Sequence, residues 1–176
     1  MEDAVAVITL DSRKLAAFDI SLSSQRFNFK CKRCASLCCN LGGPIITRKD
    51  IELIESIGYF VSDFFEPLKK NEVYSSIVVG GLKAKKDGSC IFLRSDIKQK
   101  QHYCSIYPVR PVLCKLYPFT FEFYNSNKIV LKIIPCCMGL NSYEGELITE
   151  KFILKSILKL LFEAMKLFKT GYSYPV

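Results

Sequence analysis

The sequence predicts an α+β fold, a small cysteine-rich domain with short antiparallel hairpins, short helices and a long C-terminal helix. Two patterns predict it. Apolar and polar residues alternate in short stretches separated by turn sequences, and residues 149–169 carry an apolar stripe at helical spacing. The 176 residues, 49% of them hydrophobic, are enough for one core, so we expect a single domain over residues 1–176.

The first third of the chain predicts two strands and a helix. The run Ala-Val-Ala-Val-Ile-Thr at residues 4–9 suits a strand, with a frayed tail as the alternative, and alternation favours a strand at residues 25–30. Thr47 and Asp50 have the spacing of a capping box, and the apolar residues that follow recur at helical spacing. We therefore expect a helix that begins after Thr47 and ends near Gly58.

The middle of the chain predicts one more short helix and several strands. Ser62 and Asp63 favour a helix over residues 62–68. Residues 73–83 are typical of a strand interrupted at Gly80-Gly81 by a bulge or a hairpin turn. Residues 90–106 predict a hairpin whose first strand covers residues 90–93.

The last third predicts a hairpin and the long helix. Residues 119–124 and 128–134 alternate on either side of a polar turn, and a tight turn with two cysteines follows at residues 135–139. Lysines interrupt the apolar residues of the helix expected at residues 149–169, so it never reaches the roughly 18 uncharged residues that a bilayer span requires. We expect no membrane span.

The nine cysteines are too many and too clustered for packing alone. Four of them lie in the nine residues Cys-Lys-Arg-Cys-Ala-Ser-Leu-Cys-Cys at 31–39. The pair Cys31 and Cys34 has the CxxC spacing with which two thiolates converge on one metal ion. The adjacent Cys38 and Cys39 point apart, so we do not expect one ion to bind both. This nonapeptide predicts either a multinuclear cluster or two nearby sites.

Three further cysteines lie in segments whose local structure the sequence predicts. The hairpin predicted above brings Cys90 and Cys104 close together. Pro111 can open a helix at its first position, which places Cys114 one turn inside that helix. Arg110, just ahead, can place a guanidinium near the thiolates or near an acidic side chain.

Charge and cysteine usage bound the compartment and the partners. Acidic residues precede the first apolar run, which is the wrong order for a secretory signal, so we predict a cytoplasmic protein. Cytoplasmic cysteine clusters favour metals over disulfides, and an odd number fits full disulfide pairing badly. The formal net charge of +8 falls to about +4 to +6 once thiolates bind metal, so we discount nucleic-acid binding.

The string at 104–119, Cys-Ser-Ile-Tyr-Pro-Val-Arg-Pro-Val-Leu-Cys-Lys-Leu-Tyr-Pro-Phe, follows the first cysteine cluster and Cys90. Together they resemble the CxxCxxCC family of zinc- or iron-chelating proteins, the YkgJ-like cysteine-cluster proteins. The resemblance places the metal-chelating region at about residues 27–140. The spacing from Cys34 to Cys38 is one residue longer than is usual in that family.

The resemblance also implies a set of ligands. It marks seven cysteines as chelating, and an eighth lies in a turn similar to the family's later Cys-x-Gly turn. The implied metal ligands are Cys31, Cys34, Cys38, Cys39, Cys90, Cys104, Cys114 and Cys137. Cys136 is an additional sulfur that stays unassigned. We expect Arg110 to support the site without binding the metal itself.

The sequence leaves two cofactors open, an iron–sulfur cluster or Zn²⁺. Near-absence of histidine and apolar residues beside the sulfurs favour an iron–sulfur cluster of the 4Fe–4S type, whereas the CxxC start and the lack of an obvious electron partner favour zinc. A redox-active metal would serve electron transfer or support a protein modification.

Two alternative functions follow from the same residues. Structural zinc would make the chain an interaction module for a protein or RNA partner, with the lysine-rich C-terminal helix as the contact surface. By family analogy, because some relatives are annotated flagellin lysine methylases, the chain could be a lysine methylase-like enzyme. No glycine-rich loop for a methyl donor is evident, so the sequence leaves open whether the protein is an enzyme.

Overall fold

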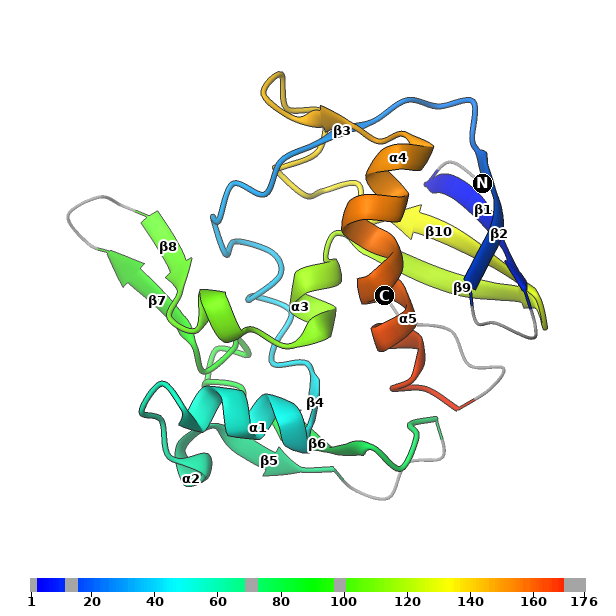
Figure 1. Cartoon of the computed structure of the whole chain (residues 1–176). Coiled ribbons are helices and arrows are strands. Elements are labelled where there is room, and N and C mark those ends of the chain that lie inside the picture. Colours follow the sequence, from blue (N-terminus) through cyan, green and yellow to red (C-terminus); the bar gives the residue numbers. More distant parts are fainter. Residues whose placement is uncertain (1–2, 12–15, 69–72, 97–100, 170–176) are drawn as a thin grey trace. The chain divides into compact units, whose positions relative to one another are not determined.

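The computed structural model describes residues 3–11, 16–68, 73–96 and 101–169, and it contains the strands and helices of an α+β fold (Figure 1). The chain divides into two compact units. The terminal unit consists of Met1–Lys32 and Leu116–Val176, and the central unit is Arg33–Lys115. The expectation of one domain over the whole chain stays a prediction.

A four-stranded antiparallel sheet forms the main part of the terminal unit. Its strands are β1 (Ala4–Asp11), β2 (Ala16–Leu22), β9 (Phe119–Asn125) and β10 (Lys128–Ile133), in the order β2-β1-β10-β9. The β9–β10 hairpin predicted from alternation is thereby confirmed, and of the two alternatives for residues 4–9 the strand is the one that forms. Sequence order alone did not show that β1 pairs with β10, because that contact joins segments that are far apart in the sequence.

A second, two-stranded sheet pairs β3 (Asn28–Phe29) with β11 (Glu146–Leu147). The prediction of a strand over residues 25–30 was therefore too long. Strand β11 supplies only two residues that pair with β3. Outside this pair, single backbone hydrogen bonds hold the segment, such as the 2.8 Å bond from the Ile148 N–H to the Phe27 carbonyl.

The C-terminal helical segment begins after Thr149, whose side-chain oxygen accepts a hydrogen bond from the Phe152 N–H at 3.2 Å. It runs through α4 (Glu150–Phe152), a π-helical turn η2 (Ile153–Ile157) and α5 (Leu158–Met165). The predicted helix is confirmed over this range. The π-turn was not predicted, because the buried residues Ile153, Ile157 and Leu161 recur every four residues, a spacing that an ordinary α-helix also shows.

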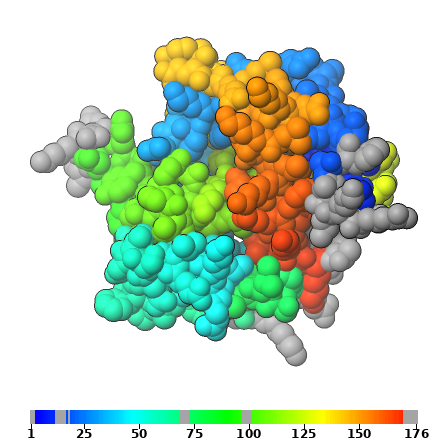
Figure 2. Space-filling model, viewed as in Figure 1, coloured from blue at the N-terminus to red at the C-terminus, as the bar shows by residue number. Residues whose placement is uncertain are grey.

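Aromatic rings hold this helical segment, and the turn that follows it, against the sheet of the terminal unit. The ring centroids of Phe121 and Phe168 are 6.0 Å apart, and those of Phe119 and Phe152 are 6.2 Å apart. Phe119, Phe121 and Ile153 are almost completely buried. The outer face of the helical segment, orange to red in Figure 2, carries the exposed Lys155 and Lys159.

The central unit contains a three-stranded antiparallel sheet and two helices. The strands are β4 (Ile45–Thr47), β5 (Phe65–Pro67) and β6 (Val78–Leu82), in the order β4-β6-β5. Helix α1 (Arg48–Glu55) follows β4 directly, and helix α2 (Val61–Phe64) leads into β5.

The capping box predicted for α1 is present. The Thr47 side-chain oxygen accepts a hydrogen bond from the Asp50 N–H at 3.3 Å, and the Asp50 carboxylate accepts one from the Thr47 N–H at 2.8 Å. Ile54 is completely buried on the apolar face of the helix. The start of α1 was thus correctly predicted from two polar residues and the stripe behind them.

One other prediction for this unit was wrong, and a second was right in one of its two alternatives. The helix expected over residues 62–68 ends at Phe64, because Phe65 to Pro67 pair with β6 instead. The hairpin turn considered at Gly80-Gly81 is not formed, since both glycines are paired residues inside β6, but the bulge alternative agrees with the register, in which Val79 is an extra residue between the paired Val78 and Gly80. A side chain at Gly80 would overlap the ring of Phe65, so glycine at this position permits close approach and does not mark a turn.

The hairpin predicted over residues 90–106 is formed by β7 (Leu93–Asp96) and β8 (Gln101–Cys104), and its tip lies outside the described residues. Residues 90–92, predicted as strand, instead form a turn that the Leu93 N–H closes on the Cys90 carbonyl at 3.0 Å. A 3₁₀ turn, η1 (Tyr107–Val109), and helix α3 (Val112–Leu116) follow.

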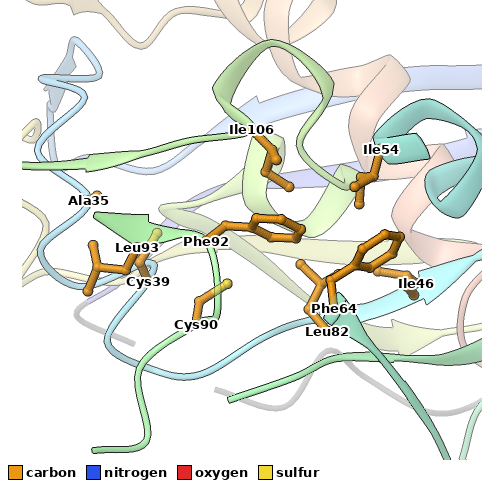
Figure 3. Close-up of a cluster of buried hydrophobic side chains, with 10 residues drawn as sticks. All are labelled: Ala35, Cys39, Ile46, Ile54, Phe64, Leu82, Cys90, Phe92, Leu93 and Ile106. Atoms are coloured by element: carbon orange, nitrogen blue, oxygen red, sulfur yellow. The ribbon is translucent and has the colours of Figure 1, made fainter. Parts of the chain in front are cut away.

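The central unit has its own hydrophobic core, drawn in Figure 3. Phe92 lies at its middle, with its ring centroid 5.0 Å from that of Tyr59 and 5.6 Å from that of Phe64. Two residues of this core are cysteines, Cys39 and Cys90, and each is 5% exposed. Two sulfurs of the predicted ligand set therefore lie in an apolar environment.

Candidate metal centre

An irregular loop carries the first cysteines of the central unit. Arg33 and Ala35 have φ angles of 56° and 50°, in the left-handed region that costs a non-glycine residue about 1 kcal/mol or more. Turns follow, with the Leu41 N–H bonded to the Leu37 carbonyl at 3.1 Å. This turn carries the half-buried Cys38 and the buried Cys39.

Backbone hydrogen bonds fix the other sulfurs of the central unit beside this loop. The Cys90 N–H donates to the Cys39 carbonyl at 2.7 Å. Cys104, the last residue of β8, is paired with Leu93, three residues beyond Cys90. Segments far apart in the sequence thereby bring Cys39, Cys90 and Cys104 to one place.

Three thiols are in direct contact. The Cys39 side chain hydrogen-bonds to those of Cys38 and Cys104, and these bonds lower the pKa of Cys38 and of Cys104 to about 7 each. The nearby Arg110 guanidinium lowers both values further, whereas burial opposes the change. The same contacts raise the pKa of Cys39 far above its ordinary value, so Cys39 holds the proton that its neighbours share.

Cys90 and Cys114 complete the sulfur set, which we define as Cys38, Cys39, Cys90, Cys104 and Cys114. Burial raises the pKa of Cys90, and the negative charges of Cys104 and Cys38 raise it further. Burial of its thiol raises the pKa of Cys114, and charge on Cys90, Cys104 and Cys38 acts in the same direction. The sulfurs thus lie close enough for ionisation of one to oppose ionisation of the next.

Cations surround the sulfur set. The Arg110 guanidinium lies 3.9 Å from the centroid of the Tyr107 ring and acts on the pKa of three thiols. Lys85 lowers the pKa of Cys90 and Arg94 that of Cys104. Lys85 Nζ donates to the Leu93 carbonyl at 2.5 Å, and Arg94 Nη1 donates to the Ile91 carbonyl at 2.6 Å. Sequence reasoning missed Lys85 and Arg94, although both flank the segment that carries Cys90.

The remaining cysteines are placed differently. Cys34 is half-buried, and its sulfur lies 3.4 Å from the Ser36 hydroxyl. Cys31, Cys136 and Cys137 belong to the terminal unit. There, Phe29 forms an antiparallel bridge with Leu140 and the Lys30 N–H donates to the Gly139 carbonyl at 3.0 Å, so Cys31 and Cys137 lie on neighbouring segments.

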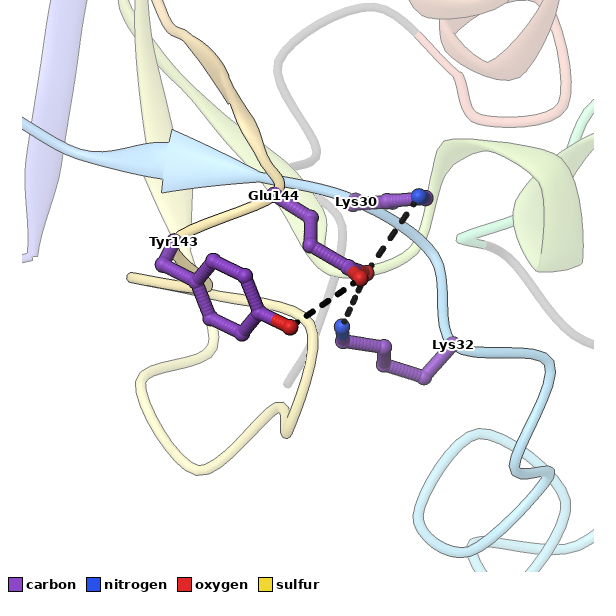
Figure 4. Close-up of polar contacts among 4 residues, drawn as sticks. All are labelled: Lys30, Lys32, Tyr143 and Glu144. Atoms are coloured by element: carbon purple, nitrogen blue, oxygen red, sulfur yellow. Dashed lines mark hydrogen bonds and ion pairs between the residues drawn. The ribbon is translucent and has the colours of Figure 1, made fainter.

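An ion-pair cluster flanks Cys31 in the terminal unit (Figure 4). The Glu144 carboxylate accepts hydrogen bonds from Lys30 Nζ at 3.3 Å and Lys32 Nζ at 3.0 Å, and the Tyr143 hydroxyl donates to its other oxygen at 3.2 Å. The two lysines lower the pKa of Glu144 to about 2. The cluster thereby holds Lys30 and Lys32, the residues on either side of Cys31, to the segment that carries Glu144.

The side chains of the sulfur set are chemically suited to a soft or borderline metal. No disulfide joins the nine cysteines, all of which lie in the described residues. As the side chains stand, no group of three or more histidine, cysteine, aspartate or glutamate residues within the described ranges has a metal-binding arrangement. Thiols that now hydrogen-bond to one another would have to turn toward a shared ion. Sulfurs around Zn²⁺ lie about 3.8 Å apart, a separation close to that of hydrogen-bonded thiols.

Comparison with known proteins identifies the family. The CxxCxxCC family, described as a "putative zinc- or iron-chelating domain", matches residues 30–147, which is more than half of the chain. The protein belongs to the CxxCxxCC family. The resemblance seen in the cysteine motifs is thereby confirmed, and the description of the family agrees with the expectation of a zinc- or iron-chelating protein.

One relative among the curated proteins is the uncharacterized protein MJ0661 of Methanocaldococcus jannaschii. It is 33% identical over 147 residues, which cover 81% of this chain and 74% of the relative. No solved structure matches this CxxCxxCC protein. In the described part of the chain, no helix is long and apolar enough to cross a membrane.

Proposed function

We propose that this CxxCxxCC protein binds a metal centre through thiolates of the sulfur set in its central unit. The observation that carries the proposal is the contact of Cys39 with both Cys38 and Cys104, with Cys90 and Cys114 within electrostatic reach. Ligands drawn from separate segments tie the loop, the β7–β8 hairpin and helix α3 together. Metal binding should therefore stabilise the folded central unit.

Charge balance supports this proposal. Four thiolates around a divalent ion, or around a cluster core of charge +2, carry a net charge of −2. Lys85, Arg94 and Arg110 lie near the thiols and can offset that charge. Without a metal, buried thiolates would repel one another, which is why the metal-free site keeps a proton on Cys39.

We favour an iron–sulfur cluster of the 4Fe–4S type as the bound group. Cys39 and Cys90 lie in the apolar core beside Phe92, and a low-dielectric, water-poor environment protects such clusters and tunes their potential. The only histidine, His102, lies on the exposed hairpin, with its Nδ1 2.9 Å from the Ser95 hydroxyl, so the centre is supplied by sulfur. When bound, the cluster would supply one-electron redox chemistry, either for electron transfer or in support of a protein modification.

Structural Zn²⁺ is the second candidate, and the CxxC pair Cys31 and Cys34 favours it. In that case the protein would act as an interaction module for a protein or RNA partner. The exposed Lys155 and Lys159 on the C-terminal helical segment offer the contact surface.

Anaerobic purification of the full chain separates the two candidates. An iron–sulfur centre gives a brown protein that contains iron and acid-labile sulfide in equal amounts. A colourless protein with stoichiometric zinc would replace the first candidate by the second. A protein that holds neither metal after reconstitution would refute the proposed function.

A further inference from the structure

Two arginine side chains lie over the same aromatic ring beside the sulfur set. The guanidinium carbon of Arg33 is 4.8 Å from the centroid of the Tyr107 ring, and that of Arg110 is 3.9 Å from it. Both groups stay charged at any physiological pH. One cation over the ring is favourable by about 0.5–1 kcal/mol at an exposed site, but a second like charge nearby is repelled by the first.

Neither arginine has a carboxylate partner among the described residues. The ion pairs of that part of the chain join Lys30 and Lys32 to Glu144 and Lys132 to Glu122. In the same described part, the buried Nε of Arg110 has no hydrogen-bond acceptor. A buried donor without an acceptor costs about 1–3 kcal/mol, so an acceptor at this position would stabilise the protein.

The backbone is also unfavourable where it presents Arg33. This exposed residue has a φ of 56°, a conformation that L-residues other than Asn and Asp seldom adopt. The strained loop thus directs the guanidinium over Tyr107, where like charge repels it. Strain, uncompensated charge and an unmet buried donor occur together at one place, and a bound anion would relieve the last two.

We propose that Arg33 and Arg110, held by the ring of Tyr107, bind the carboxylate or phosphate group of a small-molecule ligand beside the metal centre. Two guanidiniums provide the paired N–H donors that match an oxyanion, and the ring limits the positions that they can take. This inference goes beyond metal binding, because it assigns a ligand site to residues that do not bind the metal.

The position of the site gives it a role. Arg110 is near enough to Cys38 and Cys104 to act on their ionisation, so an anion held by Arg110 would lie next to the sulfur set. The rest of the ligand would then be anchored beside the metal. A structural zinc site or a centre that only transfers electrons has no need of such an anchor, whereas a catalytic centre does.

The test is a titration of the full-length, metal-loaded protein with inorganic phosphate and, separately, with acetate at constant ionic strength. Arginine Nε–H signals report binding by nuclear magnetic resonance. The midpoint of thermal unfolding gives a second measurement of binding, one that does not depend on the spin state of the metal. Saturable binding of phosphate only would indicate a phosphate ligand. Binding of acetate only would indicate a carboxylate ligand.

Three variants distinguish a built site from general attraction to a protein of formal net charge +8. Arg33→Gln should weaken binding at least about tenfold, and Arg33→Lys should weaken it too, because lysine keeps the charge but loses the planar fork. Arg48→Gln removes the same charge from an exposed position on α1 and should leave binding unchanged.

Each of three binding results would overturn the inference: no saturable binding of either anion, equal binding by Arg33→Gln and the wild type, or equal binding by Arg33→Lys and the wild type. Metal content is measured on every sample, and we expect Arg33→Gln to keep its metal. Loss of the metal in Arg33→Gln would contradict an anion site that is separate from the metal ligands. A wild type without metal that still binds phosphate through Arg33 would refute the proposed function and leave this inference standing.

Discussion

Replacing Phe92 by leucine tests whether the core of the central unit is organised around that ring. Phe92 is 1% exposed and makes two ring contacts, at 5.0 Å with Tyr59 and at 5.6 Å with Phe64. Leucine retains most of the buried apolar surface but removes both aromatic contacts. Each such pair contributes about 0.5–1.5 kcal/mol beyond its buried area, so Phe92→Leu should lower the free energy of unfolding by about 1–3 kcal/mol.

The matched control for this substitution is Phe60→Leu. Phe60 is 73% exposed, so its replacement should change the free energy of unfolding by no more than about 0.5 kcal/mol. Both variants are unfolded in urea at the same metal content, and the midpoints are compared at an unchanged slope. Equal midpoints for Phe92→Leu and Phe60→Leu would refute the placement of Phe92 at the middle of the core.

Three further predictions test other parts of the structure. Thr47→Ala removes the Thr47 hydroxyl from the capping box and should lower the free energy of unfolding in urea by about 1 kcal/mol, whereas Ser62→Ala, at an exposed position in α2, should change it little. Equal effects of the two substitutions would contradict the cap. Gly80→Ala should lower the free energy of unfolding by about 1–3 kcal/mol because the new methyl group meets the Phe65 ring. Gly81→Ala should be nearly neutral, since its methyl group has no neighbour nearer than 3.6 Å. The reverse order of the two effects would contradict the pairing of β6 with β5. The pKa of Glu144 should be about 2 by carboxyl-carbon titration and should rise toward 4.5 in Lys32→Gln. Because the folded state lowers this pKa, the ion-pair cluster stabilises the fold fully above about pH 4.5, the value in the unfolded chain, and this contribution is lost as the pH falls through about 2. An unshifted pKa of Glu144 would contradict the ion-pair cluster.

Local sequence signals predicted the elements whose partners are close in the chain. The capping box of Thr47 and Asp50 gave the start of α1, and alternation around a polar turn gave the β9–β10 hairpin. Gly80 shows where such signals fail. The sequence records a glycine, but only the position of Phe65 on the neighbouring strand reveals whether it turns the chain or permits close packing.

The candidate site was predictable in chemistry and only partly predictable in arrangement. Spacing predicted the hairpin that brings Cys90 near Cys104. The expectation that one ion does not bind both Cys38 and Cys39 stays a prediction, whereas the contact between their side chains was not predicted. Contacts that depend on tertiary folding, such as those of Lys85 and Arg94, leave no periodic signal in the sequence.

The grouping of the predicted ligands is a further example. The resemblance to the family implied eight metal ligands in one set, of which Cys31 and Cys137 belong to the terminal unit. Their participation in the metal centre, that of Cys34, and the supporting role of Arg110 stay predictions. Removal of each sulfur in turn, followed by metal analysis, would assign them.

Metal content of two cysteine variants tests the central claim most directly. Cys104→Ser removes a thiol that contacts Cys39 in the sulfur set, and Cys136→Ser removes an exposed thiol of the terminal unit. We predict that Cys104→Ser, purified without air, loses most of its bound metal while Cys136→Ser keeps the wild-type amount. Full metal content in Cys104→Ser, or equal loss in the two variants, would contradict a metal centre built on the sulfur set.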